Sequence, residues 1–452
     1  MKRRISVLLV LCALLPVMLT GQSVRAEEGS DGRLPAIYLT TREGAPIVSL
    51  EEYLSCTVDA EGTGEDDTFS GIAAEIRVRG NSSAYYGDVE KILANSVPYR
   101  LRFEKKRNLF GLHQGEAFRN WVLLPAGWDL VRNELALRMA RAIFGSTAYV
   151  SDSCFVHVYV NGDFKGVYVL CEQNQVNRGR VNVNEPDPEN EDPLVGYYLE
   201  LDNYAWSEPD NAFFTLYYEN GRVRDVRGDE RRFVPAEYSV KSDITSAEQL
   251  KFIRQYLKNV FKILYQAVEK RTFYTFDEDW KLTKLKTKDP QEAVARAIDL
   301  DSAVDMYLLY ELVHDYDCGE GSFFLCVDFS EESEVKRLQF TSPWDFGWAY
   351  ADSTDRYWAG AFCEESFVKE YGDRSNPWFI LLAKEDWFRV LCKKRWGEVR
   401  EGVIAAMDWE KAFMESHREA LSKDYRSSPD SARHVLEWLD DRMRWMDKRF
   451  KP

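Results

Sequence analysis

The hydrophobic pattern changes its period near the middle of the chain, and this change limits the folds that are open to it. In the first half, short runs of alternating apolar and polar residues are separated by turn residues, which is typical of half-buried β-strands. From Thr245 onwards, apolar residues recur with the spacing of amphipathic helices. The sequence therefore predicts an α+β fold of two coupled lobes, strand-rich over residues 34–240 and helix-rich over residues 241–450.

The clearest elements can be placed by residue number. A helix from Thr245 to Lys270 is expected to begin with a capping box made by Thr245 and Glu248. The Asn161–Gly162 pair between two apolar runs predicts a β-hairpin over residues 156–172. The other expected elements are strands at 37–40, 71–78, 98–103, 121–124 and 197–201, helices at 129–144 and 306–313, a hairpin turn at Asn220–Gly221, and an almost wholly helical stretch beyond Asn376.

Residues 1–26 have the three parts of a secretory signal peptide: a positive start, an apolar stretch and small residues for cleavage. The apolar stretch from Ile5 to Leu19 is shorter than the roughly 20 residues that a membrane-spanning helix needs. We therefore expect the protein to be secreted or placed at the cell envelope or surface, with no stable membrane insertion once the signal is removed. An uncleaved N-terminal anchor is the alternative.

The acidity of the chain limits its possible partners. The formal net charge is -16, and loss of the four basic residues in 1–26 leaves it near -20. Such a surface repels phosphate backbones, so no nucleic-acid partner is expected. By charge complementarity, a protein partner is expected to be basic. The cysteines show no CxxC or Cys/His ligand spacing, which argues against a zinc ribbon.

Common catalytic signatures are absent from the chain. It has no phosphate-binding P-loop, no Rossmann glycine pattern, no HExxH and no Gly-x-Ser-x-Gly. Three other clusters carry residue types that are suited to chemistry. They are Arg79-Gly80-Asn81-Ser82-Ser83, Asp315-Tyr316-Asp317 and Ser342-Pro343-Trp344-Asp345-Phe346-Gly347-Trp348.

Each cluster has a functional and a structural interpretation. The glycine turn after Arg79 can point backbone N–H groups at an anion, or it can be a tight turn beside a surface ion pair. Asp317 can accept a proton from a hydroxyl or hold a divalent cation, or it can be a solvated loop residue. Asp345 lies among three aromatic rings, which are expected to exclude water and strengthen its hold on a cation. The alternative is an Asp that caps the following turn.

Asp317 and Asp345 occur in the order that protein kinases use. In those enzymes, an Asp that orients the acceptor hydroxyl precedes an Asp-Phe-Gly sequence whose carboxylate holds magnesium. Here Asp345 follows Asp317 by 28 residues and is itself followed by Phe346 and Gly347. The order of the clusters therefore favours phosphoryl transfer.

A linked series of motifs resembles the CotH kinase family, that is, spore coat protein H and its relatives. The resemblance implies an atypical protein-kinase-like fold with two lobes, in a kinase domain over residues 27–450. It also implies transfer of the ATP γ-phosphoryl group to Ser or Thr of a protein, with Mg²⁺ or Mn²⁺. The resemblance extends from about Leu34 to Trp396. The motifs that carry it are residues 79–83, 98–103 and 121–124, Arg132-Asn133, residues 161–168, Glu172, residues 196–202 and Pro343-Trp344-Asp345.

The resemblance also implies roles for individual residues. Asp317 matches the catalytic Asp of the family, and Asp345 matches the Asp that holds the metal. Ser322 stands where relatives often place an Asn, and would be a further metal ligand. The candidate cofactor-binding residues lie in segments that line the nucleotide site of the family, and they are Arg79, Arg100, Arg102 and Glu172.

Departures from the family keep other functions open. Val97 stands where relatives commonly carry a Lys, and the hydroxyl of Ser322 is a weaker, neutral metal ligand. A catalytically inactive scaffold or adhesin at a cell or spore surface is therefore an alternative. A third interpretation is a carbohydrate-active or carbohydrate-binding protein, in which Glu200 and Asp202 share one face of a strand as an acid and base pair.

Overall fold

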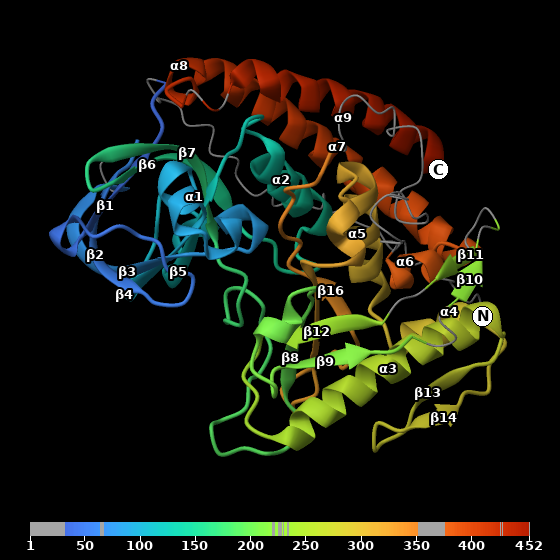
Figure 1. Ribbon diagram of the computed structural model, residues 1–452. Helices are drawn as coiled ribbons and strands as arrows, with labels where there is room; N and C mark the ends of the chain where they lie inside the picture. The colour runs from blue at the N-terminus through green and yellow to red at the C-terminus, as the bar shows by residue number, and fades with distance from the viewer. Residues whose placement is uncertain are drawn as a thin grey trace, which may run out of the picture.

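Seven strands from the first half of the chain close into a barrel in the computed structural model (Figure 1). They are β1 (Ala36–Thr41), β2 (Leu54–Glu61), β3 (Phe69–Val78), β4 (Tyr99–Arg107), β5 (Phe118–Pro125), β6 (Ser153–Val160) and β7 (Asp163–Glu172). Their order around the barrel is β1-β2-β3-β4-β5-β7-β6, and β6 closes it by pairing in parallel with β1. The structure describes residues 32–63, 67–218, 222–224, 228, 230–232, 235–350, 376–424, 426 and 428–451.

Alternation along the strands decides which side chains fill the barrel. On β3 and β4, residues such as Ile76 and Leu101 are buried in the barrel interior, where they form part of its own hydrophobic core. The intervening residues, such as Arg77 and Arg100, lie on the outer face and are only half-buried. The outer face of β3 and β4 is therefore charged, whereas the interior is apolar.

A second sheet of five strands takes members from both halves of the chain. Its order is β16 (Gln339–Thr341), β15 (Phe323–Asp328), β8 (Gly196–Leu201), β12 (Ala236–Val240) and β9 (Phe213–Leu216). The long helix α3 (Ala247–Glu269) covers one face, where the Tyr197 ring lies 6.3 Å from the Phe252 ring. Tyr198 and Glu200 alternate with Tyr197 and therefore lie on the other face of the sheet.

Helix α2 (Arg132–Phe144) connects the barrel to the helical part of the molecule. It packs on β6 and also on α5 (Leu300–Val313) and α7 (Asp386–Ser416). In Figure 1, α7 and α9 (Pro429–Arg449) run along the top of the molecule, with α2 and α5 beneath them. The residues of α2 that face the barrel share one hydrophobic core with the five-stranded sheet and the helices. The arrangement is a mixed α+β fold, strand-rich first and helix-rich later, consistent with a two-lobed kinase-like fold.

The remaining elements are short. Two small hairpins pair β10 (Arg222–Arg224) with β11 (Glu230–Arg232) and β13 (Tyr274–Phe276) with β14 (Leu282–Lys284). The short helices are α1 (Val89–Ala94), α4 (Pro290–Ala295), α6 (Pro377–Leu382) and α8 (Arg418–Leu421). Among the residues that the structure describes, no helix combines the length and the apolar character needed to cross a membrane.

Most of the elements expected from the sequence are confirmed, with two shifts at helix starts. Asn161 (φ 52°) and Gly162 (φ 88°) form the predicted turn between β6 and β7. Helix α2 begins at Arg132 rather than at residue 129, because the left-handed backbone of Leu130 (φ 64°) precedes it. The capping box of α3 is formed by Ser246 and Gln249, one residue later than predicted. The proposed turn at Asn220–Gly221 and the proposed signal peptide lie outside the described residues.

Candidate active site

Two of the predicted acids lie at the end of α5. The helix ends at His314, whose left-handed backbone (φ 58°) turns the chain into the short 3₁₀ helix η6 (Tyr316–Gly319). Asp315 caps this turn, because its Oδ1 accepts a hydrogen bond from the Asp317 N–H at 3.0 Å. Asp315 is buried and Asp317 is half-buried, so the more accessible acid is the one predicted to orient an acceptor hydroxyl.

The pKa of Asp315 depends on the charges of Asp317 and Asp345. Burial raises the pKa of Asp315 well above its usual range, and the charges of Asp317 and Asp345 raise it further. Arg132 opposes this rise. The Oδ2 atom of Asp315 is buried, with no hydrogen-bond partner in the described part of the chain. The structure thus brings Asp317 and Asp345 together around a carboxyl group that favours its neutral form until positive charge arrives.

Asp345 lies on the loop that follows β16. Its backbone is left-handed (φ 60°), and its Oδ2 lies 3.5 Å from the Oγ of Ser322, which immediately precedes β15. The expectation that three rings shield it from water is wrong. Trp344 and Phe346 are buried, but Trp348 is 53% exposed and Asp345 itself is exposed. Because its two immediate neighbours turn inwards, the carboxylate between them turns towards solvent, where a ligand can reach it.

A group of arginines lies on the outer face of the barrel beside this loop. Arg77 and Arg100 are directly opposite each other on β3 and β4, and Arg79 follows two residues after Arg77. The guanidinium of Arg79 lies over the Trp344 ring, 5.6 Å from its centroid. Burial, together with the charges of Arg79 and Arg77, lowers the pKa of Arg100 to about 10.

These three arginines have no directly paired carboxylate within the described chain. Arg77 instead donates to the backbone carbonyl oxygens of Leu50 and, at 3.1 Å, of Val78, while the buried Nε of Arg100 has no hydrogen-bond partner there. Like charges directly opposite each other destabilise a sheet. A bound anion would relieve this repulsion, and phosphate matches the fork of donors that a guanidinium offers.

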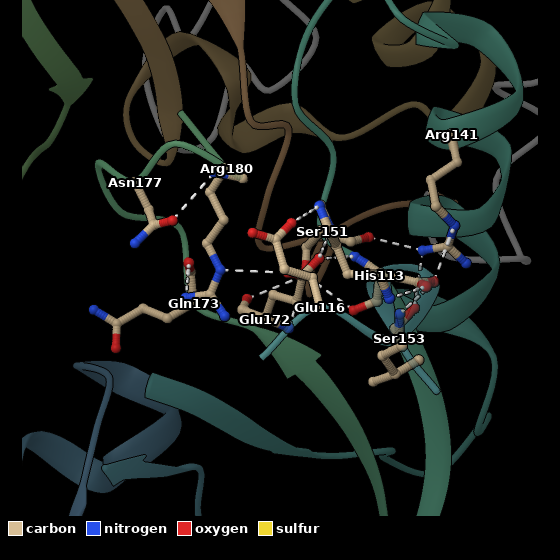
Figure 2. Close-up of polar contacts among 12 residues, drawn as sticks. His113, Glu116, Arg141, Ser151, Ser153, Glu172, Gln173, Asn177 and Arg180 are labelled. Atoms are coloured by element: carbon tan, nitrogen blue, oxygen red, sulfur yellow. Dashed lines mark hydrogen bonds and ion pairs between the residues drawn. The ribbon is translucent and has the colours of Figure 1, made fainter. Parts of the chain in front are cut away.

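The other two candidate nucleotide residues are engaged in ion pairs of their own. Arg102 lies 2.6 Å from Glu75 and stacks on the Tyr53 ring at 4.0 Å. Figure 2 shows Glu172 between Arg180 and His113, at 3.3 Å and 3.1 Å. The hydrogen bond that the His113 ring makes to the Glu172 carboxylate raises the pKa of His113, with burial opposing the rise. The structure therefore groups Arg79 and Arg100 with each other, whereas Arg102 and Glu172 each have a local partner; their role in nucleotide binding stays a prediction.

Glu200 and Asp202, the possible acid and base pair, share a third charged neighbour. Lys241 places its Nζ 3.0 Å from Glu200 and 3.3 Å from Asp202, and 2.8 Å from Glu208. Burial raises the pKa of Glu200 to about 7, while Lys241 and Arg79 oppose that rise. The two acids thus form an ion-pair cluster around Lys241 on the face of the sheet away from α3.

The donor atoms present fit a magnesium ion that is shared with phosphates. Magnesium prefers hard oxygen ligands and is usually held by one or two carboxylates together with phosphate oxygens and water. Asp345 and Ser322 supply a carboxylate and a hydroxyl, and the buried Oδ2 of Asp315 has no hydrogen-bond partner among the described residues. No cluster of three or more acidic, His or Cys side chains with metal-ligand geometry occurs among the described residues, so a bound nucleotide would have to complete the coordination.

Sequence reasoning missed several residues of this region. Arg77 lies on β3, two residues before Arg79, which follows the end of that strand. Because side chains two residues apart on a strand point to the same face, the alternation could have identified Arg77 beside Arg79. Lys241 could not be found in this way, because only the pairing of β12 with β8 brings it to Glu200. Arg132 and Asn133 carried part of the family resemblance without a role, and the structure places them against the Asp345 loop.

A comparison with known protein families identifies the family of the chain. A family model described as CotH kinase protein matches residues 76–446, which include every residue of the site discussed above apart from Tyr53 and Glu75. No curated protein matches the chain.

Proposed function

Since the chain belongs to the CotH kinase protein family, we propose that it is a protein kinase. In this proposal, it transfers the γ-phosphoryl group of ATP to a Ser or Thr hydroxyl of a protein substrate, with Mg²⁺ or Mn²⁺. The single observation that carries the proposal is the contact between a positive and an acidic region. The guanidinium of Arg79, on the barrel side, lies over the ring of Trp344, 5.6 Å from its centroid, and Trp344 directly precedes Asp345, whose charge together with that of Asp317 raises the pKa of Asp315.

This arrangement suits phosphoryl transfer, which needs positioning and charge neutralisation more than covalent chemistry. Arg79 and Arg100 would hold the phosphate oxygens, and Asp345 with Ser322 would hold the metal. The metal neutralises charge on the β- and γ-phosphates when bound. Asp317 would accept a hydrogen bond from the attacking hydroxyl and align its oxygen with the γ-phosphorus.

We propose a basic, Ser-rich protein substrate, and the charge of the chain supports its basic character. The formal charge of -16, with Glu320 close to Asp317 in the same turn, would attract Lys and Arg beside the accepting Ser. Export through the signal peptide, and a final place in the medium, the envelope or a spore coat, belong to the same proposal. Equal labelling of basic and acidic Ser peptides would count against the substrate class while leaving the kinase activity intact.

An inactive scaffold is the second candidate, and Val97 favours it. Val97 is fully buried, and its carbonyl oxygen accepts a hydrogen bond from the Tyr168 hydroxyl at 3.2 Å. A Lys could therefore replace Val97 only by burying its stem in the barrel. If the missing Lys is essential, the fold would persist without nucleotide binding.

Ligand-induced stabilisation separates the two candidates. A ligand that binds only the folded state raises the melting temperature by mass action. We expect ATP with Mg²⁺ to raise the melting temperature of the wild type, and Asp345→Ala to abolish the part of the rise that depends on Mg²⁺. Absence of any rise in the wild type, at millimolar ATP and Mg²⁺, would reject the kinase and favour the scaffold.

A further inference from the structure

The loop that carries Asp345 is held in a conformation that it would not adopt alone. Ser342 (φ 51°), Asp345 (φ 60°) and Tyr350 (φ 63°) all have left-handed backbone, although none of them is glycine. Each such residue is strained and persists only where the surroundings enforce its conformation. The position of the Asp345 carboxylate therefore depends on the groups that hold this loop.

The first turn of α2 supplies several of those groups. The Oδ1 of Asn133 accepts a hydrogen bond at 3.0 Å from the N–H of Phe346, the residue directly after Asp345. Arg132 donates to the carbonyl oxygens of Gly347, at 3.5 Å, and of Ala349. Two side chains at the start of α2 thus hold the loop at Phe346, Gly347 and Ala349, all of which follow Asp345 in the chain.

Arg132 is itself fixed from the loop before α2. Its Nη2 lies 2.8 Å from Oδ2 of Asp129, which is buried. Burial raises the pKa of Asp129, while the charge of Arg132 opposes the rise. Arg132 also opposes the rise in the pKa of Asp315. Its positive charge therefore acts both on Asp129, before α2, and on Asp315, after α5.

We propose that Asn133 and Arg132 are positioning residues, which set the backbone of Phe346 to Ala349 and thereby aim the Asp345 carboxylate at its metal. The inference rests on the proposed kinase function. Neither residue touches the reacting atoms, so their effect passes through the loop. Loss of a group that orients a metal ligand typically weakens metal affinity 10–100-fold. Asn133 should therefore affect the affinity for metal more than the affinity for nucleotide.

The test measures the Mg²⁺ concentration that gives half of the ATP-induced rise in melting temperature, together with the ATP concentration that gives half of the rise at saturating Mg²⁺. We expect Asn133→Ala to raise the first value about tenfold or more and to change the second value less than threefold. Asn133→Asp keeps an acceptor oxygen, and a negative charge in the first turn of a helix is favourable. It should restore the wild-type Mg²⁺ value.

A matched control is Asn184→Ala, since the side chain of Asn184 donates hydrogen bonds to Asp328 Oδ2 at 2.8 Å and to Ser330 Oγ at 2.9 Å, at the other end of β15 from Ser322. It should lower stability without moving the Mg²⁺ value.

If Asn133→Ala does not fold, Asn133→Ser, with a shorter acceptor, should show an intermediate shift in Mg²⁺ dependence. Equal changes in the Mg²⁺ and ATP values, or an unchanged Mg²⁺ value, would overturn the positioning role. A wild type that shows no ATP-induced rise would instead overturn the proposed function, and this inference with it.

Discussion

Arg77 and Arg100 face each other across β3 and β4 with no described carboxylate between them. Like charges placed opposite each other weaken a sheet, and a bound anion would offset this repulsion. The burial that lowers the pKa of Arg100 to about 10 leaves it charged at neutral pH. A half-buried, charged guanidinium whose Nε lacks a hydrogen-bond partner among the described residues suits a phosphate ligand.

Replacing Arg100 should therefore separate binding from stability. We expect Arg100→Ala to weaken ATP affinity about tenfold or more, since hydrogen bonds to charged groups contribute about 1.5–3 kcal/mol. The melting temperature without ATP should stay unchanged or rise, because a like-charge contact is removed. Calorimetric titration with ATP and a thermal melt would measure both. Arg102→Ala, on the same face of β4 but paired with Glu75, is the control and should affect ATP affinity less; the reverse order would refute this division of roles.

At this scale, sequence reasoning could find residue types but not partners. Asp317 and Asp345 are predictable because their order and the residues after Asp345 follow a known pattern. The exposure of Asp345 was not predictable, since neighbouring Trp residues suggest shielding and only the backbone turn shows otherwise. Arg100 and Arg102 look equivalent by alternation, and only the contact with Glu75 distinguishes them.

Between α2 and α7, two acids are buried close together. Glu134 on α2 pairs with Arg138 and accepts a hydrogen bond from Ser153. Glu410 on α7 lies 3.7 Å from Arg138, and neither of its buried oxygens has a hydrogen-bond partner among the described residues. Burial, together with the charge of Glu134, raises the pKa of Glu410 to about 8. This helix interface is therefore sensitive to pH.

The raised pKa of Glu410 predicts a loss of stability as pH rises. Below about pH 4.5 the group is protonated in both states, whereas between that value and about 8 only the folded state keeps the proton. The free energy of unfolding should therefore fall across this window, by on the order of 3 kcal/mol between pH 5.5 and 8. Glu410→Gln does not titrate and should lose less stability over the same range. Urea unfolding at both pH values measures the difference, and identical losses in both proteins would contradict the assignment.

Elements were predictable where their signals are local. The Asn161–Gly162 hairpin formed as expected, because its turn residues fix the backbone. The capping box shifted by one residue, since Thr245-Ser246 and Glu248-Gln249 offer two registers and only the structure shows which one α3 uses. The start of α2 shifted because Leu130 adopts a left-handed backbone that no sequence signal announces.

Across the whole molecule, the C-terminal segment returns to the barrel. The Nε2 of His157 on β6 lies 2.9 Å from the carbonyl oxygen of Ala420, and the N–H of Val167 donates to Asp424 at 3.2 Å. Gly166, just before Val167, allows this close approach, since its backbone is left-handed (φ 124°) and a Cβ there would collide with Oδ2 of Asp424. The contact joins the segment that follows α7 to strands β6 and β7 of the barrel.

A methyl group at Gly166 should loosen this contact. We expect Gly166→Ala to lower the free energy of unfolding by about 2–4 kcal/mol, through overpacking and backbone strain together. Gly162→Ala in the same hairpin is the control, because its φ is also positive (88°) but nothing lies within 4 Å of the added Cβ. It should show the strain alone. Urea unfolding compares the two variants, and an equal loss in both would mean that the docked segment does not contribute.

The assembly of the five-stranded sheet is the part of the fold that local signals could not supply. β15 pairs with β8 across more than a hundred residues of chain, and β16 joins it from further along. Alternation identifies a strand but not its distant partner. These pairings bring Ser322, which directly precedes β15, and the Asp345 loop, which follows β16, to the sheet that carries Glu200.

The most direct test of the central claim is phosphoryl transfer itself. The purified chain would be incubated with γ-labelled ATP and Mg²⁺, alone and with a basic Ser-rich peptide, beside Asp317→Ala and Asp345→Ala. The account predicts label on the peptide or on the chain with the wild type, and none with either variant. Transfer that survives in both variants would contradict the assignment of the site. Absence of transfer together with absence of ATP binding in the wild type would contradict the kinase function.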